Sequence, residues 1–229
     1  MLELKPMRVT AFFDLDRTLV ACNTGRLFLQ DMRERGEISL VKVLRAVSWR
    51  TKYHFALRDV QTITAHVADF LRGRIDADFA EQCQRLVEDR VLPRLLPEGL
   101  RTIEQHRDQG HALALLSSSP SYIVAPVARA LSVEVVGATE FEVKSGRLTG
   151  QLRGPACYGA VKIHRAEELG RNHNLDIGAS WFYTDSYTDL PMLERVSHKV
   201  VVNPDPRLKR TAKTRGWAVQ DWMSSQISG

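Results

Sequence analysis

The sequence predicts a doubly wound, parallel α/β sheet with an all-helical insert after its first strand. Short apolar runs typical of buried strands alternate with amphipathic segments, and this alternation indicates parallel strands with helices on both faces. The strands are expected at residues 9–13, 111–116, 133–136, 180–184 and 198–202. Between the first two strands the pattern is helical only, so we expect the insert to sit over the edge of the sheet.

The helices follow from apolar spacing and from residues that end a helix. A helix is expected at 24–35, where apolar residues share one side and Gly36 ends the pattern. Other helices are expected at 40–55, 60–71 and 79–91 in the insert, and at 98–109, 122–131 and 162–169 in the sheet region. A hairpin is expected at 141–150, with Ser145 and Gly146 in its turn.

Length and composition place the chain among globular proteins of one domain, or of one domain with an insert. With 229 residues it can bury a sizeable core, and its 44% hydrophobic and 26% charged residues are ordinary values for such proteins. Cys22, Cys83 and Cys157 are sparse and lack metal-ligand spacing, which favours a reducing cytoplasm over a disulfide framework. The charged N-terminus and the lack of an 18-residue apolar run predict no signal peptide and no membrane span.

The basic charge of the chain is concentrated in the insert. Residues 26–58 contain eight Lys or Arg and three Asp or Glu, an excess of five that equals the net charge of +5 of the whole chain. Most of these side chains are expected to be solvated, and together they favour the approach of anionic partners. We expect those partners to be small molecules rather than nucleic acid, and the sequence indicates no particular oligomeric state.

Polar residues fall where the expected strands end. They are Asp14 and Asp16 after the first strand, Ser117 after the second, Lys162 at the start of a helix, and Asp185 and Asp189 after the fourth strand. The carboxyl ends of parallel strands meet at one edge of a sheet, so these residues are expected to gather there. Acids brought together lose hydration and repel one another, and Mg²⁺ would let them stay ionised while keeping waters for a phosphate. Alone, each residue suits a solvated turn or a helix cap equally well.

Taken in order, these residues resemble the motifs of the haloacid dehalogenase (HAD) superfamily of phosphohydrolases. The four motifs stand here as Asp14-Leu-Asp-Arg-Thr18, Ser117, Lys162 and Asp185-Ser-Tyr-Thr-Asp189. The resemblance covers nearly the whole chain, and the insert looks like the C1-type helical cap of the phosphoserine-phosphatase-like branch, subfamily IB. It implies a Rossmann-like core at 1–20 and 96–229 and a cap at 21–95.

The resemblance also implies a chemistry, that of a Mg²⁺-dependent phosphomonoester hydrolase with an aspartyl-phosphate intermediate. Asp14 would be the nucleophile, and Asp16 would protonate the leaving oxygen and later deprotonate water. Lys162 would neutralise charge on Asp14 and on the transferred phosphoryl group, whose oxygens Thr18 and Ser117 would bind.

The resemblance assigns the metal ligands as well. Mg²⁺ would be held by the carboxylates of Asp14 and Asp185 and by the backbone carbonyl of Asp16. Asp189 would orient the metal shell through water. The cap would close over the phosphate, exclude water and select the leaving group.

Two positions depart from what relatives carry. Arg17 stands where many have Gly or Ser; it either touches the substrate or lies in solvent, and we expect the second. Asn23, the fifth residue after Thr18, stands where phosphoserine phosphatases typically have a Glu that meets the substrate ammonium. The neutral amide predicts that phosphoserine is a poor substrate, unless Asp31 or Glu34 of the cap supplies the carboxylate instead.

Two other functions remain compatible with parts of this pattern. One is a phosphoacceptor signalling module, which shares an Asp, a Ser or Thr and a Lys on a similar sheet. The other is a catalytically degenerate phosphate-binding protein. The pair Asp185 and Asp189 and the large insert argue against the first, and the complete set of acids argues against the second. The substrate itself stays open among small phosphorylated metabolites, including amino-alcohol phosphates such as histidinol phosphate, and lysophospholipid phosphates.

Overall fold

The computed structural model describes residues 6–37 and 59–224, and these contain the predicted parallel α/β sheet. Its strands follow the order β3-β2-β1-β6-β7-β8, and every neighbouring pair is parallel. The strands are β1 Arg8–Phe13, β2 Ala112–Pro120, β3 Val135–Thr139, β6 Leu175–Thr184, β7 His198–Val202 and β8 Ala218–Gln220. The strand order reverses beside β1, which creates a topological switch point between β1, β2 and β6.

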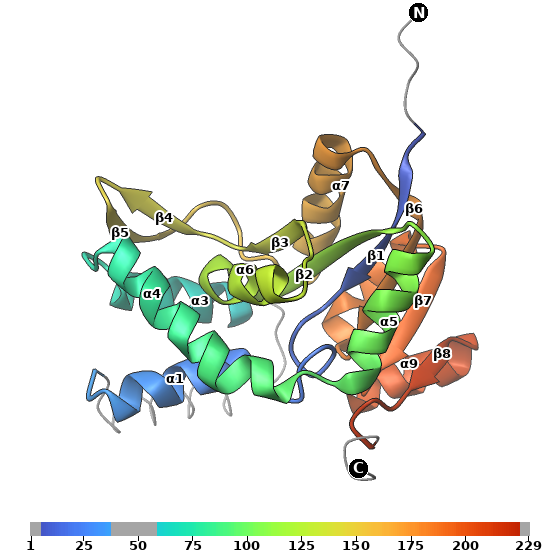
Figure 1. Ribbon diagram of the computed structural model, residues 1–229, viewed down its shortest axis with the longest axis horizontal. Coiled ribbons are helices and arrows are strands. Elements are labelled where there is room, and N and C mark those ends of the chain that lie inside the picture. The colour runs from blue at the N-terminus through green and yellow to red at the C-terminus, as the bar shows by residue number, and fades with distance from the viewer. Residues whose placement is uncertain (1–5, 38–58, 225–229) are drawn as a thin grey trace, which may run out of the picture.

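Alternation along the strands divides the core into two layers. Ala11 and Phe13 of β1 pack toward α5 and α6, whereas Phe12 packs toward α7, α8 and α9. Successive strand residues point to opposite faces, so a strand covered on both sides must be apolar throughout. The helices are α5 Pro97–Asp108, α6 Ser121–Ala130, α7 Val161–His173, α8 Leu190–Arg195 and α9 Pro206–Arg215 (Figure 1).

The described part of the insert is helical, as predicted, and lies to one side of the sheet (Figure 1). It contains α1 Thr24–Glu34, α3 Asp59–Phe70, α4 Asp76–Leu86, a wider π-helical turn at Val87–Val91 and a short 3₁₀ turn at Leu92–Arg94. The single helix predicted at 79–91 is therefore α4 followed by a change of helical pitch just before Pro93. The helix predicted at 40–55, and much of the basic segment 26–58, lie outside the described residues.

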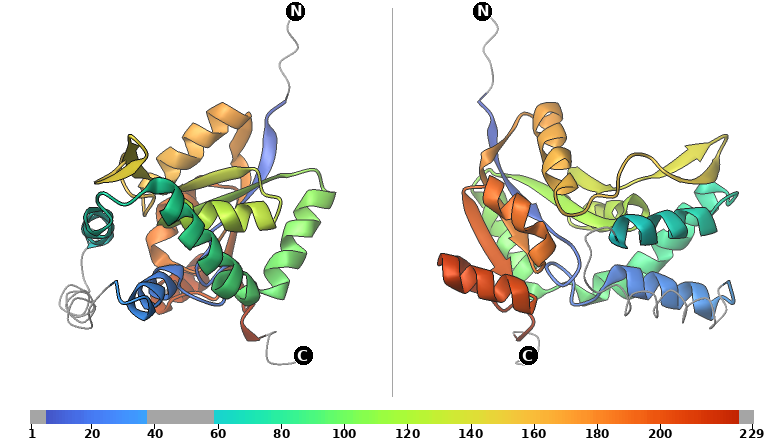
Figure 2. Two further views of the ribbon diagram at one scale, coloured as in Figure 1. Left: turned by 60° about the vertical axis from the view of Figure 1, so that its left-hand side comes forward. Right: turned by 180° about the vertical axis from the view of Figure 1, so that it is seen from behind.

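A hairpin from the sheet region packs on these helices. β4 (Phe141–Lys144) and β5 (Arg147–Leu152) pair antiparallel, with the predicted turn at Ser145 and Gly146 between them. The backbone of Leu148 accepts a hydrogen bond from Gly73 N–H at 2.8 Å and donates one to the carbonyl of Arg74 at 3.0 Å. Figure 2 shows the hairpin lying along α3 from two directions. The hairpin thus ties the insert to a second, distant part of the chain.

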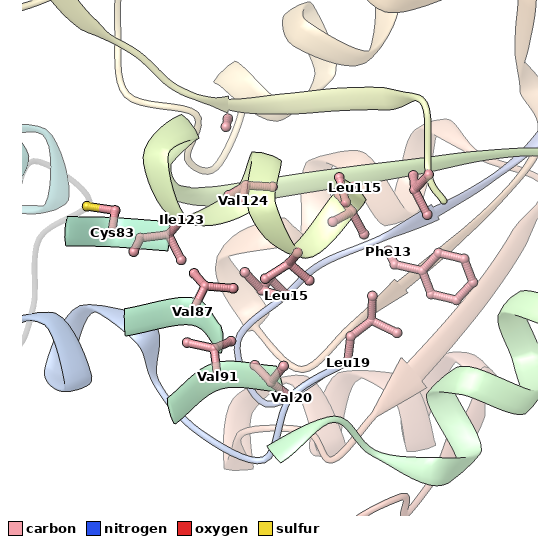
Figure 3. Close-up of a cluster of buried hydrophobic side chains, with 14 of the residues drawn as sticks. Phe13, Leu15, Leu19, Val20, Cys83, Val87, Val91, Leu115, Ile123 and Val124 are labelled. Atoms are coloured by element: carbon pink, nitrogen blue, oxygen red, sulfur yellow. The ribbon is translucent and has the colours of Figure 1, made fainter. Parts of the chain in front are cut away.

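Apolar side chains run without interruption from the sheet into the insert. Figure 3 shows Phe13 and Leu115 of the sheet, Leu15 and Leu19 of the loop after β1, and Val87 of the insert in one buried cluster. Fully burying each Val or Leu contributes about 1.5–3 kcal/mol, so the insert is held firmly against the loop that carries the first motif. The division into 1–20 with 96–229 and 21–95 stays a prediction.

Among the described residues, α8, α9, β8 and the short 3₁₀ turns at Leu92–Arg94 and Tyr187–Asp189 were not predicted from the sequence. α9 begins where the carboxylate of Asp205 accepts hydrogen bonds from the N–H groups of Arg207 and Leu208, at 2.8 and 2.9 Å. This is a helix-capping pattern that the sequence contains. β8 has three exposed residues, too few for a periodic signal. None of the helices among the described residues is long and apolar enough to cross a membrane.

His106 of α5 forms a buried network of polar side chains with His111 and with Tyr183 of β6. Its Nε2 lies 2.8 Å from the Tyr183 hydroxyl and its Nδ1 lies 2.8 Å from His111 Nδ1. Two imidazole nitrogens can share one proton only if at least one ring is neutral. Burial, followed by the nearby His111 and His198, lowers the pKa of His106 from 6.5 to about 4. The folded protein therefore favours the neutral form of this histidine.

This network predicts a loss of stability in mild acid. Between pH 6.5 and about 4 the unfolded chain binds a proton at His106 that the folded chain does not, so the contribution of His106 to stability falls as the pH falls. This pKa shift corresponds to a loss of at most about 3 kcal/mol in the free energy of unfolding. Screening by solvent reduces the expected loss to about 1–2 kcal/mol. Urea unfolding of the wild type and of His106→Gln at pH 8, 7, 6 and 5 measures it, because glutamine does not titrate. Parallel pH profiles of the two proteins would contradict the assignment.

Candidate active site

The strand register brings three of the predicted site residues to one edge. Phe13 pairs with Leu115 of β2 and with Tyr183 of β6. The residues that follow these strand positions, Asp14, Ser117 and Asp185, therefore emerge side by side at the carboxyl edge of the sheet, at its switch point.

Lys162 lies at the centre of the site, in the first turn of α7. Its Nζ donates to Asp14 Oδ1 at 2.8 Å and to Asp189 Oδ2 at 2.7 Å, and the residue is only 2% exposed. Burial lowers the pKa of the ammonium, but the two carboxylates outweigh it and the pKa is raised overall. Lys162 therefore stays charged and joins two strand ends. The Thr184 hydroxyl also donates to Asp189 Oδ2, at 2.7 Å. Thr184 was not among the residues predicted for the site; its place at the end of a buried strand was the available signal.

The acids of the site carry more negative charge than the nearby cations neutralise. Burial raises the pKa of Asp14 to about 7; Lys162 opposes the shift and Asp189 adds to it. Burial, and next the charge of Asp14, raise the pKa of Asp185 to about 8, although Arg17 acts in the opposite direction. A further cation would let these carboxylates remain ionised at neutral pH.

The donor set at this edge fits Mg²⁺. Magnesium prefers oxygen ligands, keeps several waters, and is commonly bound through one or two protein carboxylates. Asp14 and Asp185 are two such carboxylates, and the backbone carbonyl of Asp16 is the third donor predicted from the sequence. Among residues 6–37 and 59–224, no three acidic, histidine or cysteine side chains form a ready-made metal cage. Water would therefore have to complete the shell.

Two hydroxyl groups at the site suit a bound oxyanion. Thr18 is fully buried, and its Oγ1 has no hydrogen-bond partner among the residues that the structure describes. A buried hydroxyl without a partner is unfavourable by about 1–3 kcal/mol, and it calls for a ligand or water. Ser117 is buried as well, and its Oγ accepts from Ser119 N–H at 3.3 Å. Its own hydroxyl proton is therefore available for donation to an anion.

Asp16 is held by the start of α1. Its Oδ2 accepts from Asn23 Nδ2 and its Oδ1 from Thr24 N–H, both at 3.0 Å. Burial raises the pKa of Asp16, and the hydrogen bond from the Thr24 backbone opposes this shift. The Thr24 hydroxyl lies 2.7 Å from the Ser119 hydroxyl. A movement of α1 would therefore change the hydrogen bonds that hold the Asp16 carboxylate.

Arg17 is exposed, as expected, but it also contacts a carboxylate of the site, which the sequence did not indicate. Its Nε is 3.3 Å from Asp185 Oδ2, and its side chain is 51% exposed. Arg17 is therefore a half-exposed partner of a buried site carboxylate. The sequence could not reveal this pair, because the two residues are joined only by the pairing of β1 with β6.

The two carboxylates suggested as substitutes for a substrate-binding Glu are already paired within the insert. Asp31 accepts from Arg35 Nε at 2.8 Å and from Gln82 Nε2 at 3.3 Å. Glu34 pairs with Arg90. Asn23 itself points its amide at Asp16. None of these three side chains is thus an uncommitted acceptor for a substrate ammonium.

The comparison with known families agrees with this geometry. The sequence profile of the haloacid dehalogenase-like hydrolases matches residues 11–194, which contain the whole site. The chain belongs to this family. Its HAD fold carries the insert after β1 and the four motifs at the carboxyl edge of the sheet.

Relatives in sequence carry phosphatase names. A Mycobacterium tuberculosis protein named "Probable phosphatase" is 32% identical over 93% of this chain and 75% of its own length. The histidinol-phosphatase of Neisseria meningitidis is 29% identical over 93% of this chain and 98% of its own length. The present protein is a HAD-type phosphatase.

A solved structure shows the same fold. A phosphoserine phosphatase in the form of a phospho-aspartyl intermediate analogue superposes with a TM-score of 0.67 at 17% sequence identity, and the match covers 95% of this chain and 94% of the other. The fold is therefore of the phosphoserine-phosphatase-like type.

Proposed function

We propose that this phosphatase is a Mg²⁺-dependent phosphomonoester hydrolase that acts on a small phosphorylated metabolite through an aspartyl-phosphate intermediate. The observation that carries the proposal is the Lys162 ammonium held between Asp14 and Asp189, 2.8 and 2.7 Å from their oxygens. This arrangement keeps a buried carboxylate in place and ready to attack, and it supplies positive charge where a phosphoryl group would be transferred.

In this proposal the residues act in two steps. In the first, an Asp14 oxygen attacks phosphorus, the bond to the leaving oxygen breaks, and Asp16 gives that oxygen a proton. In the second, Asp16 takes a proton from water, the water oxygen attacks phosphorus, and inorganic phosphate leaves Asp14. The hydrogen bonds from Asn23 and Thr24 would position Asp16 for both proton transfers.

The phosphoryl oxygens would be bound by Thr18, Ser117 and Lys162. When bound, Mg²⁺ would supply positive charge that stabilises the transferred phosphoryl group. Its protein ligands would be the carboxylates of Asp14 and Asp185 and the carbonyl of Asp16, and Asp189 would orient the surrounding water.

Removal of divalent cations is expected to abolish activity reversibly. Burial, and next the repulsion between neighbouring carboxylates, raises the pKa values of Asp14 and Asp185, so a bound cation is needed to keep both ionised. Phosphate release from a panel of metabolite monoesters, measured after exhaustive EDTA treatment and again after added Mg²⁺, tests this. Full activity in the EDTA-treated protein would refute the metal requirement.

We propose amino-alcohol phosphates such as histidinol phosphate as the first substrate class to examine. The similarity to a histidinol-phosphatase extends over 98% of that protein. A small monoester also agrees with the burial of the proposed nucleophile, because Asp14 is only 6% exposed.

L-Phosphoserine is expected to rank below at least one other monoester in kcat/KM. The Asn23 amide donates to Asp16, so no carboxylate stands at this position to bind an amino-acid ammonium. A charged hydrogen bond contributes about 1.5–3 kcal/mol against about 1 for a neutral one, which corresponds to a loss of about twofold to thirtyfold in discrimination. A metabolite panel in which phosphoserine ranks first would overturn this prediction.

The alternative functions are separated by turnover. A phosphoacceptor module would release about one phosphate per protein, and a degenerate module would release none, whereas an enzyme continues until the ester is consumed.

The three cysteines are free in the structure. They support our further proposal of a reducing, cytoplasmic location.

A further inference from the structure

Arg17 has an unusual backbone in the loop that carries the first motif. Its φ of +58° lies in the left-handed region, which residues other than glycine rarely adopt. Two hydrogen bonds hold this conformation: Arg17 N–H donates to the Cys22 carbonyl at 3.2 Å, and the Arg17 carbonyl accepts from Asn203 Nδ2 at 2.7 Å. The surrounding structure therefore fixes the direction in which this side chain leaves the loop.

The guanidinium reaches the carboxylate of Asp185. Arg17 Nε lies 3.3 Å from Asp185 Oδ2, and the Asp185 side chain is only 13% exposed. The other cation of the site, Lys162, is engaged with Asp14 and Asp189 instead. Among the described residues, Arg17 is thus the cation that pairs with Asp185. Asp185 is in turn one of the two carboxylates that we assign to Mg²⁺.

The two cations of the site differ in how easily they can leave. Lys162 is almost fully buried between two carboxylates, so removing its ammonium would leave buried charges unpaired. The Arg17 side chain is 51% exposed and can rotate into water, where a guanidinium is well solvated. Lys162 is therefore a permanent part of the site, whereas Arg17 is exchangeable.

We propose that Arg17 is a tethered counter-cation, which occupies Asp185 in the metal-free protein and is displaced when Mg²⁺ binds. It thereby lowers the affinity of the site for the metal. This inference rests on the proposed function, in which Asp185 is a metal ligand. An Mg²⁺ ion approaches a carboxylate oxygen to about 2.0–2.1 Å. A guanidinium on the same carboxylate competes for it and repels the ion.

The test is direct measurement of Mg²⁺ binding, without substrate, by isothermal titration calorimetry. Arg17→Gln and Arg17→Gly are expected to tighten the dissociation constant about tenfold, equivalent to about 1.4 kcal/mol. Arg17→Lys keeps the charge and is expected to stay within about threefold of the wild type. Arg8→Gln is the matched control, because it removes an exposed positive charge at the opposite end of β1 and should leave the affinity unchanged.

Thermal unfolding gives a second readout. Without metal, Arg17→Gln should melt below the wild type, because Asp185 has lost its counter-charge; with Mg²⁺ it should gain more in Tm than the wild type does. Glycine suits the left-handed backbone at this position, so Arg17→Gly keeps the comparison valid if the glutamine variant folds poorly.

The outcomes separate the two proposals. Equal or weaker Mg²⁺ binding by Arg17→Gln and Arg17→Gly would overturn the counter-cation role and leave the metal site standing. Equal tightening in Arg8→Gln would assign the effect to net charge and overturn it as well. Failure of the wild type to bind Mg²⁺ would overturn both this inference and the proposed metal dependence.

Discussion

Asp14→Asn is expected to lower kcat by about 10⁴-fold or more and to abolish transfer of labelled phosphate to the protein. An amide cannot form the acyl phosphate that the proposed first step requires. The substitution keeps the shape of the side chain, and the oxygen of the new amide could still accept from the Lys162 ammonium. The protein should therefore fold normally. Acid quenching after brief exposure to a ³²P-labelled monoester measures the phosphoenzyme, and a discontinuous phosphate assay measures turnover.

Asp16→Asn is the matched control for the nucleophile. It is expected to leave the fold intact and to slow transfer mostly for esters with poor leaving groups, which need a proton. Proton transfer of this kind contributes about 10²–10⁴ in rate, so activated aryl phosphates should lose far less than alkyl phosphates. Persistent phosphoenzyme in Asp14→Asn would exclude Asp14 as the nucleophile. Equal losses for both ester classes in Asp16→Asn would exclude Asp16 as the general acid.

Lys162→Met is expected to have the largest effect on stability. The ammonium is held by Asp14 and Asp189, which are 6% and 1% exposed, and its loss leaves both carboxylates buried without a cation. Breaking a buried pair from one side destabilises by about 3–5 kcal/mol. Activity should fall by at least about 10²-fold, because the positive charge beside the transferred phosphoryl group is gone.

The pH dependence of Lys162→Met identifies the cause. Burial raises the pKa of Asp14 above the unfolded value of 3.8, and the variant has lost the Lys162 cation that opposes this shift. The folded variant then binds more protons than the unfolded chain, so its stability increases as the pH falls from 8 toward 5. Urea unfolding at both pH values tests this, with Lys213→Met on the exposed side of α9 as the control for loss of one charge. Destabilisation that is independent of pH would indicate a packing defect instead.

Much of the fold could be predicted from the sequence because its signals are local. The apolar run that becomes β1 and the residues that become β7 need no knowledge of their neighbours. Strands buried on both faces are mostly apolar, and glycine is common just after the last residue of a helix. The order of the polar residues at the strand ends likewise indicated the site, because parallel strands present their carboxyl ends at one edge.

Only the tertiary structure decided the contacts between residues that lie far apart in the chain. Lys162 could be assigned to a helix from its pattern, but its place between Asp14 and Asp189 depends on how α7 packs on the sheet. The direction of the Asn23 amide toward Asp16 depends on where α1 begins.

The partner of Arg17 was not predicted, for the same physical reason. In sequence, an arginine in a polar loop resembles any solvated cation. The parallel register of β1 with β6, and the left-handed backbone held by Asn203, bring its guanidinium to Asp185. Local patterns determined which residues reach the edge of the sheet, and the pairing of distant strands decided which charges meet there.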